Sequence, residues 1–131
     1  MNATTFFVAG TSFRQEDVRR FTGGEEITFI PEPDNPYDPH AVKVMGHLNS
    51  LEQSSVESIQ LGYVPRQITL QLKRSILTPS FKGAKIFKVA RSKPTVPVGV
   101  EVQLFFEGIC PNLSYSKCKD LRDMPDESEP G

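Results

Sequence analysis

The sequence has no long hydrophobic run, and no stretch approaches the ~18 consecutive apolar residues of a membrane-spanning helix. The apolar stretch at residues 4–9 is also too short for the core of a signal peptide. With 131 residues, the chain has the length of one domain. We therefore expect a soluble, intracellular monomer without a membrane partner.

Cysteine is scarce as well, with only Cys110 and Cys118 near the C-terminal end. Two such residues do not make a disulfide framework, so we expect free thiols. The chain also lacks a glycine-rich phosphate loop, a His-Glu-x-x-His pair and a nucleophile elbow. His40 and His47 do not complete a zinc-ligand spacing with the cysteines. We therefore predict a protein without enzyme activity, without a bound metal and without another cofactor.

Acidic residues are missing from residues 58–100, which carry eight bases. In contrast, residues 1–57 carry nine acids against four bases, and residues 120–131 carry five acids against one base. A basic surface attracts phosphate, whereas an acidic segment is solvated or competes for the same surface. Phe81 and Phe87 are interleaved with the bases, a composition found in grooves that bind single-stranded DNA. Alternatively, these lysines belong to the solvated faces of strands and helices.

Runs of β-branched, aromatic and alternating apolar residues predict six strands, over residues 4–9, 25–30, 40–45, 61–64, 84–90 and 98–106. Between them, the polar, serine-rich residues 46–60 predict a mobile surface excursion. Proline and serine predict a turn at residues 92–97. The pattern indicates a mainly β fold, a largely antiparallel barrel or sandwich decorated by helices.

Two helices are predicted between these strands. Ile68, Leu72 and Ile76 recur every four residues and mark the buried face of a helix over residues 65–77. Arg66 and Lys73 are seven residues apart and would share an exposed side of that helix. A shorter helix is predicted from residue 11 or 12 to about residue 21. Residues 120–131 are expected to form an acidic, disordered tail.

The stretch EPDNPYDPHAVKV, residues 32–44, joins two predicted strands and contains three prolines. Proline excludes a helix there and favours a stiff loop, which loses little conformational entropy when a ligand binds. Tyr37 would stack on a flat ligand, and the Asp38 carboxylate would accept a hydrogen bond from a hydroxyl group such as that of a sugar. The alternatives are a plain connector and, for Asp38, an Asx-type turn before Pro39.

Other candidate residues lie outside this stretch. Phe13 is either a second stacking ring or a core residue of the short helix. Tyr63 and Arg66 flank Pro65 at a helix start, which makes either an anion site or an ordinary cap with a solvated arginine. A group of acids could bind a divalent ion in a nuclease, although we favour a solvated acidic face: Glu25, Glu26, Glu32, Asp34 and Asp38.

Three blocks resemble the signatures of the HIRAN domain and stand in the family's order: VAGT at residues 8–11, IPEPDNPYDPHAVKV at 30–44 and LGYVPR at 61–66. The resemblance implies a modified OB-like, six-stranded β-barrel flanked by one or two α-helices, over residues 1–119. It also implies a binding module that captures the 3′-hydroxyl end of single-stranded DNA, as in fork-remodelling DNA translocases. DNA repair proteins are then expected as further partners, and the module would be cytoplasmic in a bacterium or phage, or nuclear if it is excised from a eukaryotic protein. A protein-interaction or regulatory domain that keeps the fold without the end-binding pocket is the alternative.

The resemblance also implies roles for particular residues, by position. Tyr37 and Phe13 would stack on the terminal bases, and Asp38 would hold the 3′-hydroxyl. Asn35 would shape the pocket, and Arg66, assisted by Tyr63, would meet a backbone phosphate.

A later-strand aromatic is expected to line the pocket too, either Phe81 or Phe87, with Lys73 on the basic side. Two positions depart from the family pattern. Phe13 stands in place of a tyrosine, which keeps the ring but removes a hydroxyl. Ser12 replaces a basic residue, so a lower affinity for phosphate is expected.

Overall fold

The computed structural model describes residues 1–50, 55–90, 98–108, 110, 111 and 113. The predicted turn at residues 92–97 and the predicted tail at 120–131 lie outside these residues. The strands are β1 (Asn2–Phe7), β2 (Glu26–Pro31), β3 (Val42–Ser50), β4 (Ser55–Tyr63), β5 (Phe81–Ala90) and β6 (Gly99–Phe106). The helices are the 3₁₀ helix η1 (Thr11–Phe13), α1 (Gln15–Val18), the 3₁₀ helix η2 (Arg66–Ile68) and α2 (Thr69–Ile76).

The strands form one antiparallel sheet in the order β1-β6-β5-β2-β3-β4. This confirms the predicted mainly β, OB-like fold, but over the described residues the sheet is not closed into a barrel, which corrects the expected six-stranded barrel. Over the residues that the structure describes, the two outer strands are joined by an isolated bridge between Ala9, just beyond β1, and Tyr63 at the end of β4. One bridge does not make a ladder, so the sheet stays open.

The predicted excursion at residues 46–60 is wrong in placing these residues outside the sheet, because residues 46–50 belong to β3 and residues 55–60 belong to β4, and the two strands pair antiparallel. Gly46 reads as a strand end in the sequence, but it lies inside β3, where a Cβ atom would come within 2.7 Å of the Phe21 ring. The hairpin beyond it has polar residues on both sides, and the His47 ring is hydrogen-bonded to the Ser58 hydroxyl at 2.9 Å. Periodicity detects half-buried strands, and most described residues of the hairpin beyond Gly46 are too exposed to carry that signal.

The predicted helix before residue 21 is present only as two short turns, η1 and α1. Arg14 interrupts them, because its backbone (φ −136°, ψ 37°) leaves the helical region. Val18 and Phe21 are fully buried, as the sequence predicts. The thin apolar face of this segment explains why a longer helix does not form.

The predicted helix over residues 65–77 is confirmed, with a break between η2 and α2. Ile68 and Leu72 are fully buried and fix its inner face. Arg66 is exposed, whereas Lys73 is half-buried. The two bases are therefore not equally exposed, because the change from 3₁₀ to α geometry alters the spacing of side chains around the axis.

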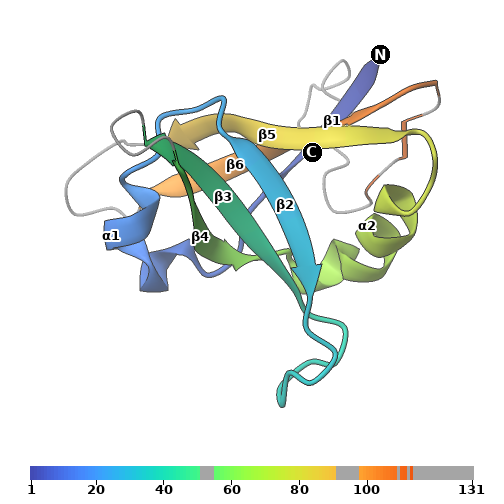
Figure 1. Ribbon diagram of the computed structural model, residues 1–131. Coiled ribbons are helices and arrows are strands. Elements are labelled where there is room, and N and C mark those ends of the chain that lie inside the picture. Colours follow the sequence, from blue (N-terminus) through green and yellow to red (C-terminus); the bar gives the residue numbers. More distant parts are fainter. Residues whose placement is uncertain (51–54, 91–97, 109, 112, 114–131) are drawn as a thin grey trace, which may run out of the picture.

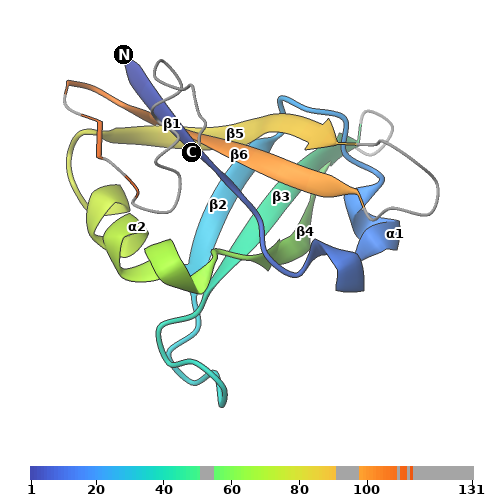
Figure 2. The ribbon, with the colours of Figure 1, turned by 180° about the vertical axis from the view of Figure 1, so that it is seen from behind.

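The core lies on the inner face of the sheet. Figure 2 shows β1 and β6 crossing in front of β2 and β3, with α1 and α2 on opposite sides of the molecule. Alternate residues of β6 are buried, namely Val100, Val102, Leu104 and Phe106. The Phe6 and Phe29 rings pack 6.1 Å apart between β1 and β2.

Among the described residues, no helix has the length and apolar character to cross a membrane.

Candidate nucleic-acid interface

The loop between β2 and β3 projects from one end of the sheet, at the bottom of Figure 1. Its base is closed by a hydrogen bond from the Glu32 N–H to the Ala41 carbonyl, at 2.8 Å. Inside it, the Asn35 N–H donates to the Glu32 carbonyl and the Ala41 N–H donates to the Asp38 carbonyl, both at 3.0 Å. The loop is thus two consecutive turns, in keeping with the predicted non-helical segment.

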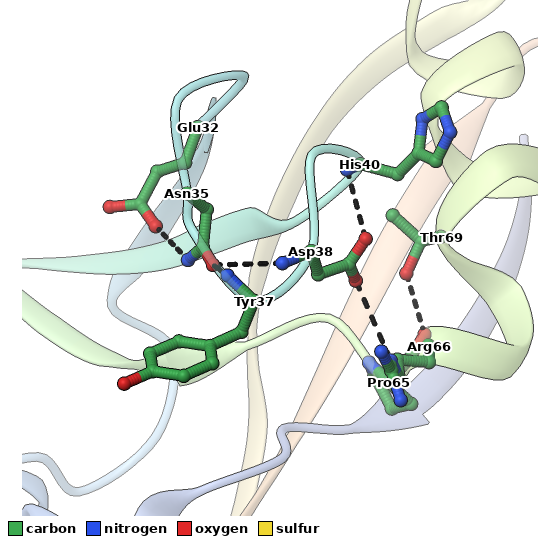
Figure 3. Close-up of polar contacts among 8 residues, drawn as sticks. All are labelled: Glu32, Asn35, Tyr37, Asp38, His40, Pro65, Arg66 and Thr69. Atoms are coloured by element: carbon green, nitrogen blue, oxygen red, sulfur yellow. Dashed lines mark hydrogen bonds and ion pairs between the residues drawn. The ribbon is translucent and has the colours of Figure 1, made fainter.

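Asn35 shapes this loop from within. Its side-chain oxygen accepts hydrogen bonds from the backbone N–H groups of Tyr37 and Asp38, at 2.8 and 3.0 Å. Its side-chain nitrogen donates to Glu32 Oε1 at 3.0 Å (Figure 3). A single amide therefore fixes both the turn and the direction of the two residues that follow.

Two aromatic rings are left almost completely in solvent. Phe13 is 90% exposed and Tyr37 is 88% exposed, the highest values for aromatic residues in the described part of the chain. The exposure of Phe13 excludes the alternative that its ring packs in the core. In Figure 3 the Tyr37 ring and the Asp38 carboxylate extend to opposite sides of the loop. Solvent-exposed rings are available as stacking surfaces for flat groups.

The Asp38 carboxylate takes part in a turn and also faces an arginine side chain. Its Oδ1 accepts a hydrogen bond from the His40 N–H at 2.9 Å, so the Asx-type turn is present. Its Oδ2 lies 3.7 Å from Arg66 Nε, across the gap between the loop and η2 (Figure 3). The Arg66 side chain is 76% exposed, so this ion pair is screened and leaves the guanidinium accessible to a further anion.

Tyr63 lies beside the loop without being part of it. Its hydroxyl donates to Glu32 Oε1 at 2.9 Å, so the carboxylate accepts from both Tyr63 and Asn35. Lys43 Nζ lies 3.5 Å from Glu32 Oε2. The hydrogen bond from Asn35, with those from Tyr63 and Lys43, lowers the pKa of Glu32 below its ordinary value.

The hydrogen bonds of Glu32 to Tyr63 and Asn35 are not predicted from the sequence, in which Glu32 is one of several acidic residues. Its hydrogen-bond partner Tyr63 is 31 residues away along the chain. Local patterns carry no signal for a contact at that separation, because it depends on the order of the strands in the sheet.

The later-strand aromatics lie elsewhere. The ring of Phe81 packs against the core residue Phe106, with 5.5 Å between the ring centroids. Phe87 is 53% exposed, but β5 pairs with the first residues of β2, Glu26 and Ile27. The loop follows the other end of β2, about 17 Å away at ~3.3 Å per residue. The structure thus does not bring Phe87 to this loop.

The acidic residues of the N-terminal half do not gather. Glu25 accepts hydrogen bonds from the N–H groups of Thr22 and Gly23, at 2.9 and 2.7 Å, and so closes a local turn. In the part of the chain that the structure describes, no group of three or more His, Cys, Asp or Glu side chains is arranged to hold a metal ion. Cys110 is half-buried, and this burial raises the pKa of its thiol.

Comparison with protein families matches residues 1–107 to the HIRAN domain. Comparisons with curated proteins and with solved structures each found no match. The matched residues include all six strands, both α-helices, the loop and Tyr63. HIRAN domains are binding modules rather than typical catalysts, and the family indicates binding to nucleic acid. The chain belongs to the HIRAN domain family.

Proposed function

We propose that this protein binds the 3′-hydroxyl end of single-stranded DNA and acts in the repair or processing of DNA ends, including those at stalled forks. The observation that carries the proposal is that an aromatic ring and a carboxylate occupy adjacent positions of one projecting loop, with an arginine facing the carboxylate. An exposed ring, Tyr37, stands next to a carboxylate, Asp38, that faces the accessible guanidinium of Arg66. A terminal nucleotide offers one complementary group to each of them: a base, a hydroxyl and a neighbouring phosphate.

The Asp38 carboxylate supports an end-specific mode of binding. An ionised carboxylate accepts hydrogen bonds and repels phosphate, so it favours a free hydroxyl over an internal phosphodiester or a 3′-phosphate. Its side chain is 22% exposed, and the bond from the His40 N–H uses only part of the acceptor capacity of one oxygen. Acceptor capacity is left for a sugar hydroxyl.

Arg66 would supply the attraction that the loop itself lacks. The guanidinium lies 3.7 Å from Asp38 and is mostly exposed, so a phosphate one nucleotide from the end would reach it while the hydroxyl meets the carboxylate. Arginine suits this role because its planar donors match phosphate oxygens in pairs.

Stacking would hold the bases. Tyr37 and Phe13 would each take one base, and Asn35 would keep Tyr37 and Asp38 in place through the two backbone bonds it accepts. Since the Tyr37 ring and the Asp38 carboxylate extend to opposite sides of the loop, the terminal nucleotide would lie across it (Figure 3). Phe87 is not included in this site, and Lys73 would act only as part of the general basic charge.

The experiment is fluorescence anisotropy with one short single strand carrying a 3′-hydroxyl, a 3′-phosphate or a 3′-blocking group. The proposal predicts tightest binding to the hydroxyl and a loss of about tenfold or more with the 3′-phosphate, since like charges brought together cost several kcal/mol. Equal affinity for the three ends would reject end recognition.

A second function, docking of a protein partner, is favoured by a different observation. On the outer face of the sheet, Phe7 is paired in register with Glu101, and Glu101 with Lys88, next to Phe87. The two phenylalanines are 49% and 53% exposed. Exposed aromatic residues are enriched at protein contact surfaces, and charged residues belong to the rim of such surfaces. Absence of binding to any of the three strands would favour this function over the first.

A further inference from the structure

Tyr63 connects the two segments that carry the exposed rings. Its hydroxyl donates to Glu32 Oε1 at the base of the Tyr37 loop. Its backbone forms two hydrogen bonds with Ala9, from the Ala9 N–H at 2.8 Å and to the Ala9 carbonyl at 2.9 Å. Ala9 is followed directly by the turn to Phe13, whose N–H donates to the Gly10 carbonyl at 3.1 Å. One residue at the end of β4 thus touches both sides of the candidate site.

Glu32 is the point where the loop is attached to Tyr63. Its carboxylate accepts from Asn35 and Tyr63 through one oxygen, at 3.0 and 2.9 Å, and lies 3.5 Å from the Lys43 ammonium through the other. Hydrogen bonds to an ionised acceptor are stronger than those between neutral groups. Because Asn35 in turn holds the N–H groups of Tyr37 and Asp38, a shift of Glu32 would be passed to the binding residues.

Gly62 is the residue that lets the segments meet. A Cβ atom built there would lie 2.2 Å from the Ala9 carbonyl oxygen and 2.8 Å from a methyl group of Val8. The first of these is backbone, which cannot turn away as a side chain would. A residue other than glycine would therefore push Ala9 away from Tyr63 and separate the Phe13 turn from the loop.

We propose that Glu32 and Tyr63 are positioning residues that hold the Tyr37 loop and the Phe13 turn in fixed relation before any ligand arrives. Neither acts by touching the ligand: Glu32 acts through Asn35, and Tyr63 acts through Glu32 and Ala9. A loop fixed in advance loses less conformational entropy on binding, so the connection raises affinity and end selectivity. The part of the inference that concerns the free loop is independent of the ligand, and the part that concerns selectivity rests on the proposed function.

Hydrogen exchange in the free protein tests the first part. The Tyr37 and Asp38 amides report directly on Asn35, because both donate to its side-chain oxygen. We expect Glu32→Ala to speed their exchange about tenfold, as a charge-assisted bond is lost. Tyr63→Phe removes only one of the hydrogen bonds to the carboxylate, so it should speed exchange less, about threefold. Glu32→Gln keeps an acceptor oxygen and should restore most of the protection.

The matched control is Glu57→Gln on β4, which breaks the exposed ion pair between Glu57 and Arg20, at 2.8 Å. This variant should leave both amides unchanged. Unchanged exchange in Glu32→Ala and Tyr63→Phe, with the fold intact by circular dichroism, would overturn the positioning role.

End selectivity tests the second part. Glu32→Ala should reduce the ratio of affinities for 3′-hydroxyl and 3′-phosphate strands at least about threefold, with partial rescue by Glu32→Gln. A purely structural contact would lower the melting temperature and leave this ratio as in the parent protein. If the parent is selective and the ratio stays unchanged, the role in selectivity is overturned while the proposed function stands. If the parent itself shows no selectivity, the proposed function fails, and the exchange experiment still decides the role in the free protein.

Discussion

Asp38 and Arg66 form an ion pair across the edge of the candidate site, with 3.7 Å between Oδ2 and Nε. One belongs to the loop after β2, and the other begins η2. The pair places an acceptor for a hydroxyl next to a donor for a phosphate, which is the arrangement that the end of a strand requires. The loop stretch has a net negative charge, so the positive charge that attracts a phosphate comes from a separate part of the chain, at Arg66.

Arg66→Ala should weaken binding to every single strand, whatever its 3′ group, because the guanidinium would meet a phosphate. The dependence of log affinity on log salt should become less steep by about 0.7, the value of one phosphate contact on a single strand. Titrations at several salt concentrations measure this slope. Arg20→Ala, at the ion pair with Glu57, is the control and should leave it unchanged. An unchanged slope in Arg66→Ala would contradict the phosphate role.

Tyr37→Ala should cost about 1–3 kcal/mol of binding free energy, the usual value for one stacked base. Tyr37→Phe should keep most of it, because the ring remains. Since the side chain is 88% exposed, neither change should alter the midpoint of urea unfolding. A loss under about 0.5 kcal/mol, small beside the stacking range, would reject the stacking role.

Phe87→Ala separates the sequence-based prediction for that ring from its place in the structure. The ring lies on β5, beyond the end of β2 that is opposite the loop. We therefore expect less than about 0.5 kcal/mol of loss in binding to a short strand, below the stacking range. The measurement is the same titration as for Tyr37→Ala. A loss of similar size in both variants would mean that the bound strand extends over the sheet.

Gly62→Ala should destabilise the fold by about 2 kcal/mol or more, because its Cβ atom would lie 2.2 Å from the Ala9 carbonyl oxygen. Urea unfolding measures the change. Gly99→Ala is the matched control, as no atom lies within 4 Å of the Cβ it adds, and it should stay within about 0.5 kcal/mol of the parent. Similar unfolding midpoints for the two variants would show that Ala9 moves away at little cost.

Glu32 should stabilise the folded protein in a pH-dependent way. Hydrogen bonds from Asn35 and Tyr63 lower its pKa from the ordinary 4.5, so its contribution is complete above that pH and is lost as the pH falls through the lower folded value. Glu32→Gln should therefore be less stable than the parent at pH 7, and the gap should narrow as the pH falls below 4.5. Urea unfolding of both proteins from pH 7 to pH 3 measures the gap. A gap that is constant with pH would contradict a role for the ionised carboxylate.

Much of the fold can be predicted from local pattern. The alternation in β6 and the four-residue spacing of Ile68 and Leu72 place strands and a helix because one side of each is buried. The outer part of the β3–β4 hairpin cannot be found in this way, because most of its described residues are exposed, although Leu48 packs against the core. Gly46 even suggests a strand end, although it is small because the Phe21 ring packs on it.

The candidate site can also be predicted only in its local part. Tyr37, Asp38 and Asn35 are neighbours in sequence, and proline marks their loop. The contact of Tyr63 with Glu32 and the separation of Phe87 from the loop both depend on the strand order β5-β2-β3-β4. Nothing in a single strand's periodicity encodes its neighbours, so these relationships require the structure.

The most direct test of end recognition combines Asp38→Ala with the change of the 3′ group. The parent protein should bind the 3′-hydroxyl strand about tenfold or more tightly than the 3′-phosphate strand, because the carboxylate repels phosphate. Asp38→Ala should bind the two strands equally, and Asp34→Ala, in the same loop, should keep the parent's preference. A preference that survives in Asp38→Ala would contradict the account, since discrimination would then come from another group.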